Sequence, residues 1–319
     1  MPGPDAEVRT LAAHGYKAVV SSLGAMLAAA SFLGDPLITA AEPGAAAPGD
    51  YRGAMLAPWP GRLADGGFTW RGRRYDVGID EPERRTALHG RVADRRWRWR
   101  LASPVAVTLG TVLGADAGYP WRVDLAVTVA VTERGVVHTV TATNLDDEAA
   151  PLGWGVHPYL VAGAGTGTMP GPGAADGWAL AVPAATVAAA TPERLLPGGI
   201  GHVGPGLDLR GGRPLAGLAL NHTYGDLERD ASGNARVALD GPAGTAVEME
   251  IDAGYRWLQV YTADEAAGAD RRASVAVEPM TCPPDALNSG IGLIVLEPGA
   301  TASAAFTLRA GKTRRGRRP

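Results

Sequence analysis

The sequence is poor in cysteine, in long apolar runs and in net charge. Cys282 is the only cysteine among 319 residues, so no intramolecular disulfide and no cysteine-based zinc site can form. No stretch approaches the ~20 apolar residues that a membrane span requires. The apolar run at 23–33 lacks a basic lead-in and fits a buried strand better than a signal sequence. The formal net charge of −3 gives no electrostatic reason to expect nucleic acid or an anionic membrane as a partner. We therefore expect a cytoplasmic enzyme or binding protein.

A sustained helical period is also missing, and glycine and proline divide the chain into short apolar runs. The 44 glycines and 25 prolines are spread throughout, which is typical of many strands joined by turns. Residues 123–132 alternate apolar and polar side chains, the segment 133–135 turns the chain, and residues 136–143 return as a β-branched strand. The same pattern predicts a second hairpin with strands at 235–239 and 245–251.

These patterns predict one all-β domain. Further strands are expected at 17–22, 105–109, 257–262, 274–277 and 301–308. Strands do not alternate with helices, which disfavours a parallel βαβ sheet. The Gly/Pro-rich residues 162–176 and 197–206 are predicted to be surface loops, too short to link two domains. We assign residues 1–310 to a single domain and 311–319 to a basic, solvated C-terminal tail.

Two motifs have simple structural explanations. Residues 199–204 match G-x-G-x-x-G, but the prolines on both sides favour a loop over the strand and helix that a dinucleotide site needs. The arginine-rich run 91–100 contains Trp97 and Trp99, which superficially suggests stacking on nucleic acid. Alternating Arg and Trp fits a strand with one solvent-exposed and one buried face at least as well as it fits nucleic-acid binding.

Three segments place ionisable groups among small or rigid residues: 86–90, 153–160 and 275–281. Pro279 cannot donate to a sheet ladder, so the strand before it should end there and leave the Glu278 carboxylate at its rim. A carboxylate in water is the commoner explanation for a lone glutamate at a strand end. From these residues alone, a functional carboxylate and a merely solvated one both stay open.

His157 is flanked by Pro158 and Tyr159, a stiff context that can fix an imidazole against an aromatic wall. A lone histidine is more often structural than catalytic. No His or Cys arrangement with metal-ligand spacing appears in the sequence, so we expect no metal site.

The order of these segments resembles that of the aldose 1-epimerase (galactose mutarotase-like) family. The resemblance rests on segments in the family's order: Ala57 to Phe68 around Arg62, Leu88-His89-Gly90, Asn144 to Tyr159 around His157, Leu258 to Thr262 around Gln259, Glu278-Pro279-Met280, and Leu296 to Gly299. This resemblance implies a large single-domain antiparallel β-sandwich, the family's supersandwich, with a small-molecule sugar on its concave face. It also implies that no cofactor is needed.

The resemblance further implies roles for individual residues. Glu278 would be the general base and His157 the general acid. The residues expected to contact the sugar are Arg62, His89, Asn221, Gln259 and Tyr159.

These roles make chemical sense for interconverting anomers. The C1 hydroxyl must lose its proton while the ring oxygen gains one, so that the ring opens to the aldehyde and can reclose in the other anomer. Each catalytic group must lie within roughly 2.6–3.2 Å of its proton. We expect a carboxylate that is charged at neutral pH and an imidazole whose pKa, near ~6.5 when unperturbed, is shifted modestly upwards.

Three positions depart from the family pattern. Gly61 stands where Asn is usual before the arginine, Arg91 follows Gly90 where a second glycine is usual, and Asn221 replaces a sugar-binding aspartate. An amide can hydrogen-bond a hydroxyl but cannot supply a charge-assisted bond. Sugar preference is therefore less well indicated than the chemistry.

Other functions stay open at this point. A hexose-6-phosphate epimerase would need a basic phosphate cradle, for which Arg62, Arg91 and Arg210 are candidates. A non-catalytic sugar-binding protein of the same fold is another alternative. An accessory β-sandwich module would be favoured if His157 and Glu278 lay far apart.

Overall fold

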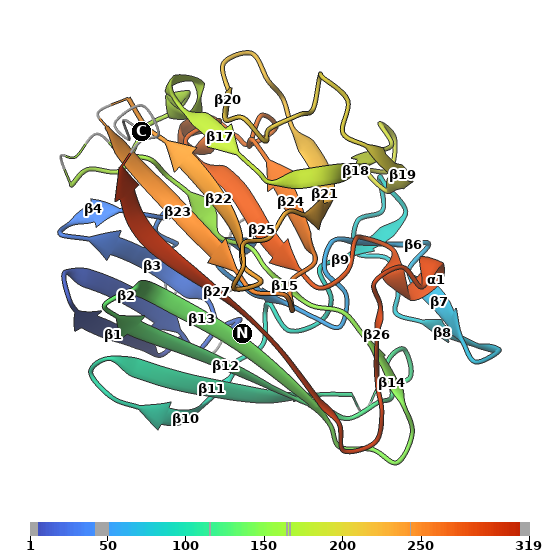
Figure 1. Ribbon diagram of the computed structural model, residues 1–319. Helices are drawn as coiled ribbons and strands as arrows, with labels where there is room; N and C mark the ends of the chain where they lie inside the picture. The colour runs from blue at the N-terminus through green and yellow to red at the C-terminus, as the bar shows by residue number, and fades with distance from the viewer. Residues whose placement is uncertain are drawn as a thin grey trace.

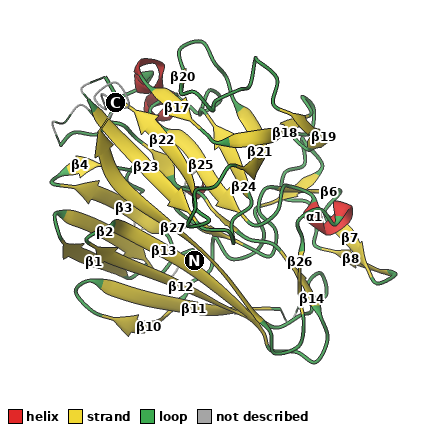
Figure 2. Ribbon diagram, viewed as in Figure 1, coloured by secondary structure: helices red, strands yellow, loops and turns green. Residues whose placement is uncertain are grey.

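The computed structural model describes residues 6–41, 51–114, 116–163, 165, 167–242 and 244–312. Within these ranges the regular secondary structure is nearly all antiparallel strand, with one short α-helix, α1 (Ala286–Ser289), at one edge and two 3₁₀ turns, Ala174–Gly177 and Gly268–Asp270 (Figure 2). None of the helices described is long or apolar enough to span a membrane. The predicted all-β fold is confirmed.

Two large sheets form the body of the molecule (Figure 1). The first has the order β10 (Arg98–Ala102), β11 (Ala106–Leu113), β12 (Val123–Thr132), β13 (Gly135–Asn144), β27 (Thr301–Lys312), β23 (Thr245–Ile251), β22 (Ala235–Asp240), β17 (Ala179–Ala181) and β20 (Arg213–Pro214). The second has the order β19 (Pro197–His202), β18 (Ala184–Ala190), β21 (Asn221–Leu227), β24 (Trp257–Tyr261), β25 (Val275–Met280), β15 (Gly155–Val156) and β5 (Met55–Leu56), with β16 (Tyr159–Leu160) also paired to β25.

Smaller sheets complete the fold. The N-terminal sheet contains β1 (Val8–Ala13), β2 (Tyr16–Ser21), β3 (Leu27–Phe32) and β4 (Asp35–Pro36); the short pairs are β6 (Arg62–Ala64) with β9 (Thr86–Leu88), β7 (Gly67–Trp70) with β8 (Arg73–Asp76), and β14 (Ala150–Leu152) with β26 (Ile294–Leu296). Strand β2 packs against β12 and β13, and a bridge between Ile38 and Leu160 ties the N-terminal sheet to the second large sheet. This sheet therefore extends the second layer of the sandwich.

Both predicted hairpins are present. In β12 the buried and half-buried side chains alternate along all ten residues, and β12 pairs with β13 from Val123↔Asn144 to Thr132↔Gly135. Strands β22 and β23 form the second hairpin. The arginine-rich run 91–100 leads into a strand, β10, as predicted. Trp97 is buried, while Arg98 and Arg100 in β10 are exposed.

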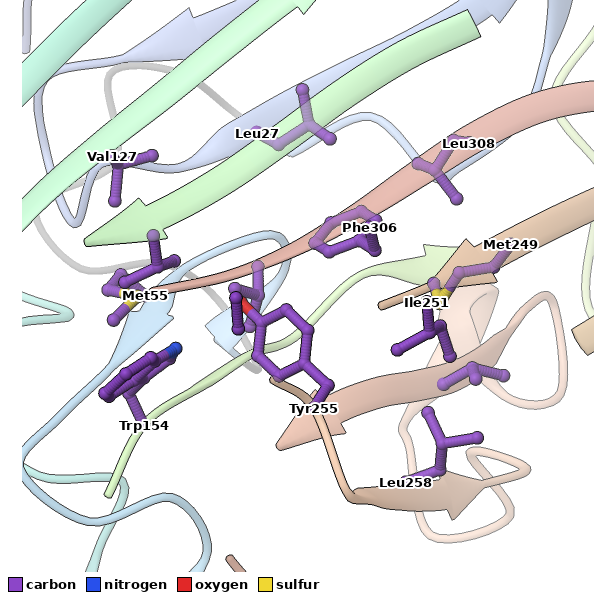
Figure 3. Packing of buried hydrophobic residues seen from close by; sticks show 14 of the residues in the cluster. Leu27, Met55, Val127, Trp154, Met249, Ile251, Tyr255, Leu258, Phe306 and Leu308 are labelled. Atoms are coloured by element: carbon purple, nitrogen blue, oxygen red, sulfur yellow. The ribbon is translucent and has the colours of Figure 1, made fainter. Parts of the chain in front are cut away.

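One apolar core lies between the two large sheets (Figure 3). Phe306 and Leu308 of β27 lie beside Met249 of β23, while Leu258 of β24 enters from the other sheet. Each of these side chains is almost fully buried, which stabilises the fold by about 1.5–3 kcal/mol per side chain. The sandwich is therefore rigid beneath the strands that carry the site.

Two strand predictions were wrong. Strand β25 does not end before Pro279 but continues to Met280. Val277 and Thr281, two residues to either side, donate their amides to carbonyls of the segment 154–158. Because alternate residues of a strand face the same neighbour, Pro279 faces the interruption between β15 and β16, where a missing donor disturbs no regular ladder.

Residues 197–202 form strand β19 and not a loop. They pair with β18 at the edge of the second sheet and are mostly exposed, which explains how a Gly-rich segment can be a strand here. Of the predicted basic tail, only residues 311–312 are described, as the end of β27, and residues 313–319 lie outside the described residues.

Candidate active site

The floor of the site is the face of the second sheet that points away from the core. In β24, Leu258 and Val260 belong to the core, while Gln259 and Tyr261 line a cleft. In β25, Val277 faces the core and its neighbour Glu278 lines the cleft. The two-residue period of the strands thus separates packing residues from chemical ones.

The central feature of the cleft is a contact between the two predicted catalytic groups. His157 Nε2 lies 3.3 Å from Glu278 Oε1, although 121 residues separate them in the chain. His157 follows β15, where its amide donates to the Ala54 carbonyl at 3.1 Å and its carbonyl accepts from the Gly53 amide at 2.8 Å. These backbone bonds fix the imidazole opposite the carboxylate on β25.

Both groups keep an atom without a partner. Among the described residues, neither His157 Nδ1 nor Glu278 Oε2 has a hydrogen-bond partner, although both atoms are buried. Buried polar atoms are normally paired, and an exception calls for an explanation such as a catalytic role or a bound ligand. The pair is therefore poised to accept a polar ligand.

Burial moves the pKa of both groups towards the neutral form. Glu278 is 2% exposed, and burial raises its pKa to about 8 against a smaller opposing effect of Arg62. Burial lowers the pKa of His157 to about 3. The expectation of a charged carboxylate beside an imidazole with a raised pKa was wrong, because the site removes the water that would solvate either charge. At neutral pH the pair holds one proton, on Glu278.

His89 is oriented by reciprocal bonds with Gly61. The Gly61 amide donates to His89 Nδ1 at 3.1 Å, and the His89 amide donates to the Gly61 carbonyl at 2.8 Å. Burial lowers the pKa of His89 well below its ordinary value. The neutral ring with Nδ1 as acceptor carries its proton on Nε2, so it is a donor on its other edge.

The unusual glycine at position 61 has a steric explanation. Gly61 has a φ of 68°, and a Cβ at this position would lie 2.7 Å from Pro284 Cγ. Pro284 lines the cleft. The departure from the family pattern at Gly61 is therefore matched by a proline wall packed against it.

Arg62 is held by a carboxylate that sequence reasoning missed. Its Nε and one terminal nitrogen each donate to Glu81 at 2.8 Å, and the Thr86 hydroxyl donates to Glu81 at 2.6 Å. Burial opposes ionisation of Glu81, but the bonds from Arg62 and Thr86 outweigh it and lower the pKa. Glu81 lies in a turn before β9, and only the fold brings it to Arg62.

A chain of side-chain hydrogen bonds fixes the other side of the cleft floor. The Thr223 hydroxyl donates to Gln259 Oε1 at 2.5 Å, and Gln259 Nε2 donates to Asn221 Oδ1 at 2.7 Å. With its oxygen occupied, Asn221 presents its amide nitrogen as a donor. Asn221, Thr223 and Gln259 all line the cleft.

Aromatic rings enclose the histidines. The rings of His157 and Tyr159 stack with 5.0 Å between centroids, and those of His89 and His157 meet edge-on at 5.2 Å. The ring centroid of Tyr51, a residue that no sequence motif marked, lies 4.5 Å from that of His89. The Arg52 guanidinium lies over the ring of Tyr159, 4.9 Å from its centroid.

The cleft has a volume of about 210 Å³ and contains all the predicted site residues. Its remaining wall includes Leu195 from the connection between β18 and β19, Pro197 at the start of β19, and Glu265 after β24. No sequence pattern marked these residues, because only the fold brings them to the cleft.

One group of possible metal ligands occurs among the described residues. The ligand atoms of His89, His157 and Glu278 lie within 4.8 Å of one another, so these residues are the ones that could hold a metal ion. The sequence shows no metal-ligand spacing, and we expected no metal site from it, because these three residues come from distant segments.

Comparisons with known proteins show the family of this chain. The family model described as aldose 1-epimerase matches residues 7–309. This chain belongs to the aldose 1-epimerase family. The chain is 30% identical to the uncharacterised protein YihR of Escherichia coli over 292 residues, covering 91% of this chain and 89% of that protein.

Solved structures show the same fold at low sequence identity. The aldose epimerase homologue from Caenorhabditis elegans has a TM-score of 0.80 at 17% identity, covering 97% of this chain and all of that one. Galactose 1-epimerase from Lactobacillus acidophilus has a TM-score of 0.76 at 15% identity, with coverage of 98% and 96%. The predicted galactose mutarotase-like fold is confirmed.

Proposed function

We propose that this member of the aldose 1-epimerase family interconverts the α and β anomers of a free, uncharged aldose. The observation that carries the proposal is the 3.3 Å contact between His157 Nε2 and Glu278 Oε1 on the floor of an open cleft. An anomer exchange needs one acid and one base on the same hemiacetal, and this pair supplies both with a single proton.

The proton balance closes within the pair. Transfer of the proton from Glu278 to His157 gives a carboxylate and an imidazolium with no change in net charge. The carboxylate then takes the proton of the C1 hydroxyl while the imidazolium protonates the ring oxygen, and the C1–O5 bond breaks. The products are the open-chain aldehyde, protonated Glu278 and neutral His157. After rotation about C1–C2, the reverse transfers form the other anomer.

The surroundings support an uncharged sugar. Arg62 is occupied by Glu81, and Arg210 pairs with Asp208 outside the cleft. The remaining contacts available to a sugar are the Nε2–H of His89 and the amides of Asn221 and Gln259, which match hydroxyl groups.

The test is anomer exchange measured by polarimetry or NMR on freshly dissolved α-D-glucose and α-D-galactose. Wild-type protein should accelerate equilibration, and Glu278→Gln should abolish the acceleration while sugar binding survives. Glu297→Gln, the same change at an exposed residue outside the cleft, is the matched control and should behave as wild type. Equal rates with and without protein across several aldoses would favour a non-catalytic sugar-binding protein. A preference for α-D-glucose 6-phosphate would favour the phosphosugar alternative.

A further inference from the structure

A second hollow adjoins the catalytic cleft. It has a volume of about 570 Å³ and shares Tyr51 and Leu88 with the cleft. We call it the side recess; its other lining residues are Asp80, Gly90, Arg91, Ala93, Asp94 and Arg95. Because Tyr51 and Leu88 line both hollows, the side recess lies directly beside the cleft.

The catalytic pair indicates which end of the sugar faces the side recess. Glu278 acts at C1, and Gln259 lies directly opposite it on β24, so the Gln259 side of the floor corresponds to C2 and C3. His157 acts at the ring oxygen, and His89 and then Tyr51 follow it on the other side. In a pyranose the atoms next to the ring oxygen on that side are C5 and C6. The side recess therefore lies beyond C6.

The lining of the side recess suits hydroxyl groups. Among the described residues, the side chains of Asp94 and Arg95 make no hydrogen bond or ion pair, and the Nε of Arg91 is buried without a hydrogen-bond partner, 4.0 Å from Asp116 Oδ2. Asp80 contributes a second carboxylate. Carboxylates only accept and guanidinium groups only donate, whereas a hydroxyl does both. Two acidic and two basic side chains favour a neutral polyhydroxy group over an anion.

We propose that the side recess is a subsite for a glycosyl unit attached through O6, so that reducing disaccharides with a 1,6 linkage are substrates. This proposal rests on the proposed function, because it uses the catalytic pair to orient the sugar. The ring of Tyr51 forms the passage between the two units, and the Asp94 and Arg95 side chains bind the hydroxyls of the second ring.

The experiment compares melibiose, a 1,6-linked reducing disaccharide, with glucose and with 1,4-linked lactose by NMR exchange at equilibrium. Melibiose should show a kcat/KM about tenfold above that of glucose, the effect of one or two net hydrogen bonds. Lactose should show no such gain, since its second ring is attached at C4. Calorimetric binding of melibiose and glucose gives a second readout that does not depend on turnover.

Single variants locate the effect. Asp94→Ala and Arg95→Ala should each lower the ratio of melibiose to glucose kcat/KM at least threefold. Arg96→Ala is the matched control, because Arg96 is an exposed neighbour that does not line the side recess. It should leave the ratio unchanged.

Two kinds of result overturn the proposal. Melibiose that is bound and turned over no better than glucose excludes a glycosyl subsite, as do variants that affect both sugars equally. Glucose 6-phosphate preferred over melibiose identifies the side recess as an anion site. Failure of wild-type protein to exchange glucose anomers contradicts the proposed function separately, and the calorimetric comparison then still decides whether the side recess binds a second ring.

Discussion

Two glutamates near the catalytic cleft have opposite environments: Glu278 lines the cleft, whereas Glu81 is bonded to Arg62, which lines it. Glu81 accepts two bonds from Arg62 and one from Thr86, which together lower its pKa. Glu278 has His157 as its one polar partner among the described residues, keeps one oxygen without a partner, and has its pKa raised to about 8 by burial. At neutral pH the Glu81 carboxylate is charged and fully hydrogen-bonded, whereas the Glu278 carboxyl is mainly neutral and has one oxygen without a partner.

The difference separates structural from chemical roles. A carboxylate with full hydrogen bonding fixes its partner in place and has little tendency to exchange protons. A buried carboxylate without such bonds gives up and takes back a proton near neutral pH, which is what an acid–base catalyst needs. We infer that Glu81 positions Arg62 and that Glu278 reacts.

The largest expected effect comes from removing the partner of the reactive glutamate. His157→Asn should lower kcat by about 10²–10⁴-fold, because the ring oxygen loses its proton donor. Circular dichroism should show a folded protein. Loss of the fold instead of the rate would show that His157 is structural.

The same chemical change at the two glutamates should affect stability differently. Glu81→Gln leaves the guanidinium of Arg62 without its counter-ion and should cost about 2 kcal/mol in urea unfolding. Glu278→Gln should cost nothing. The unfolded chain ionises Glu278 above its ordinary pKa while the native state keeps the proton up to about pH 8. The free energy of unfolding of the wild type therefore falls between pH 4.5 and about pH 8. The stability of Glu278→Gln relative to wild type should rise with pH over the same range. Equal losses in both variants would remove the distinction.

The pH profile sharpens the comparison further. Activity requires one proton on the pair, so kcat should be level at neutral pH and fall about tenfold per pH unit above an apparent pKa of about 8. On the acid side kcat should fall near pH 3, where protonation of His157 adds a second proton to the pair. Stopped-flow polarimetry corrected for the spontaneous reaction measures the profile. An alkaline limit near 6.5 or below would mean that a lone imidazolium controls the rate.

The smallest effect concerns the wall opposite the catalytic pair. Arg194 lies beside Leu195 and Pro197; it contacts Asp65 at 3.1 Å and donates to the Arg84 carbonyl at 2.9 Å. These partly exposed bonds are each worth under about 1 kcal/mol. Arg194→Ala should therefore raise KM about threefold and leave kcat unchanged in steady-state assays. A fall in kcat with constant KM would show that this wall affects the chemistry.

Much of the fold was predictable because it depends on local patterns. The alternation in 123–132 and the turn at 133–135 specify a hairpin whatever surrounds them. The end of β25 was not predictable, since Pro279 is tolerated only because its neighbour happens to be interrupted there. Strand β19 was missed for a related reason, because an edge strand tolerates glycine and proline.

The site was predictable only in part. Motif order located His157 and Glu278 in the sequence, but their charges depend on burial that no local pattern records. Glu81 and Tyr51 could not have been found, because their partners Arg62 and His89 become neighbours only in the folded chain.

The most direct test of the single-proton pair is a ¹³C NMR titration of glutamate side-chain carboxyls in the sugar-free protein, with Glu278→Gln used to assign the Glu278 resonance. We predict that Glu278 stays protonated at pH 7 and titrates with an apparent pKa of about 8, while Glu81 is ionised throughout the neutral range. A Glu278 carboxyl that titrates near its ordinary value of 4.5 would contradict it.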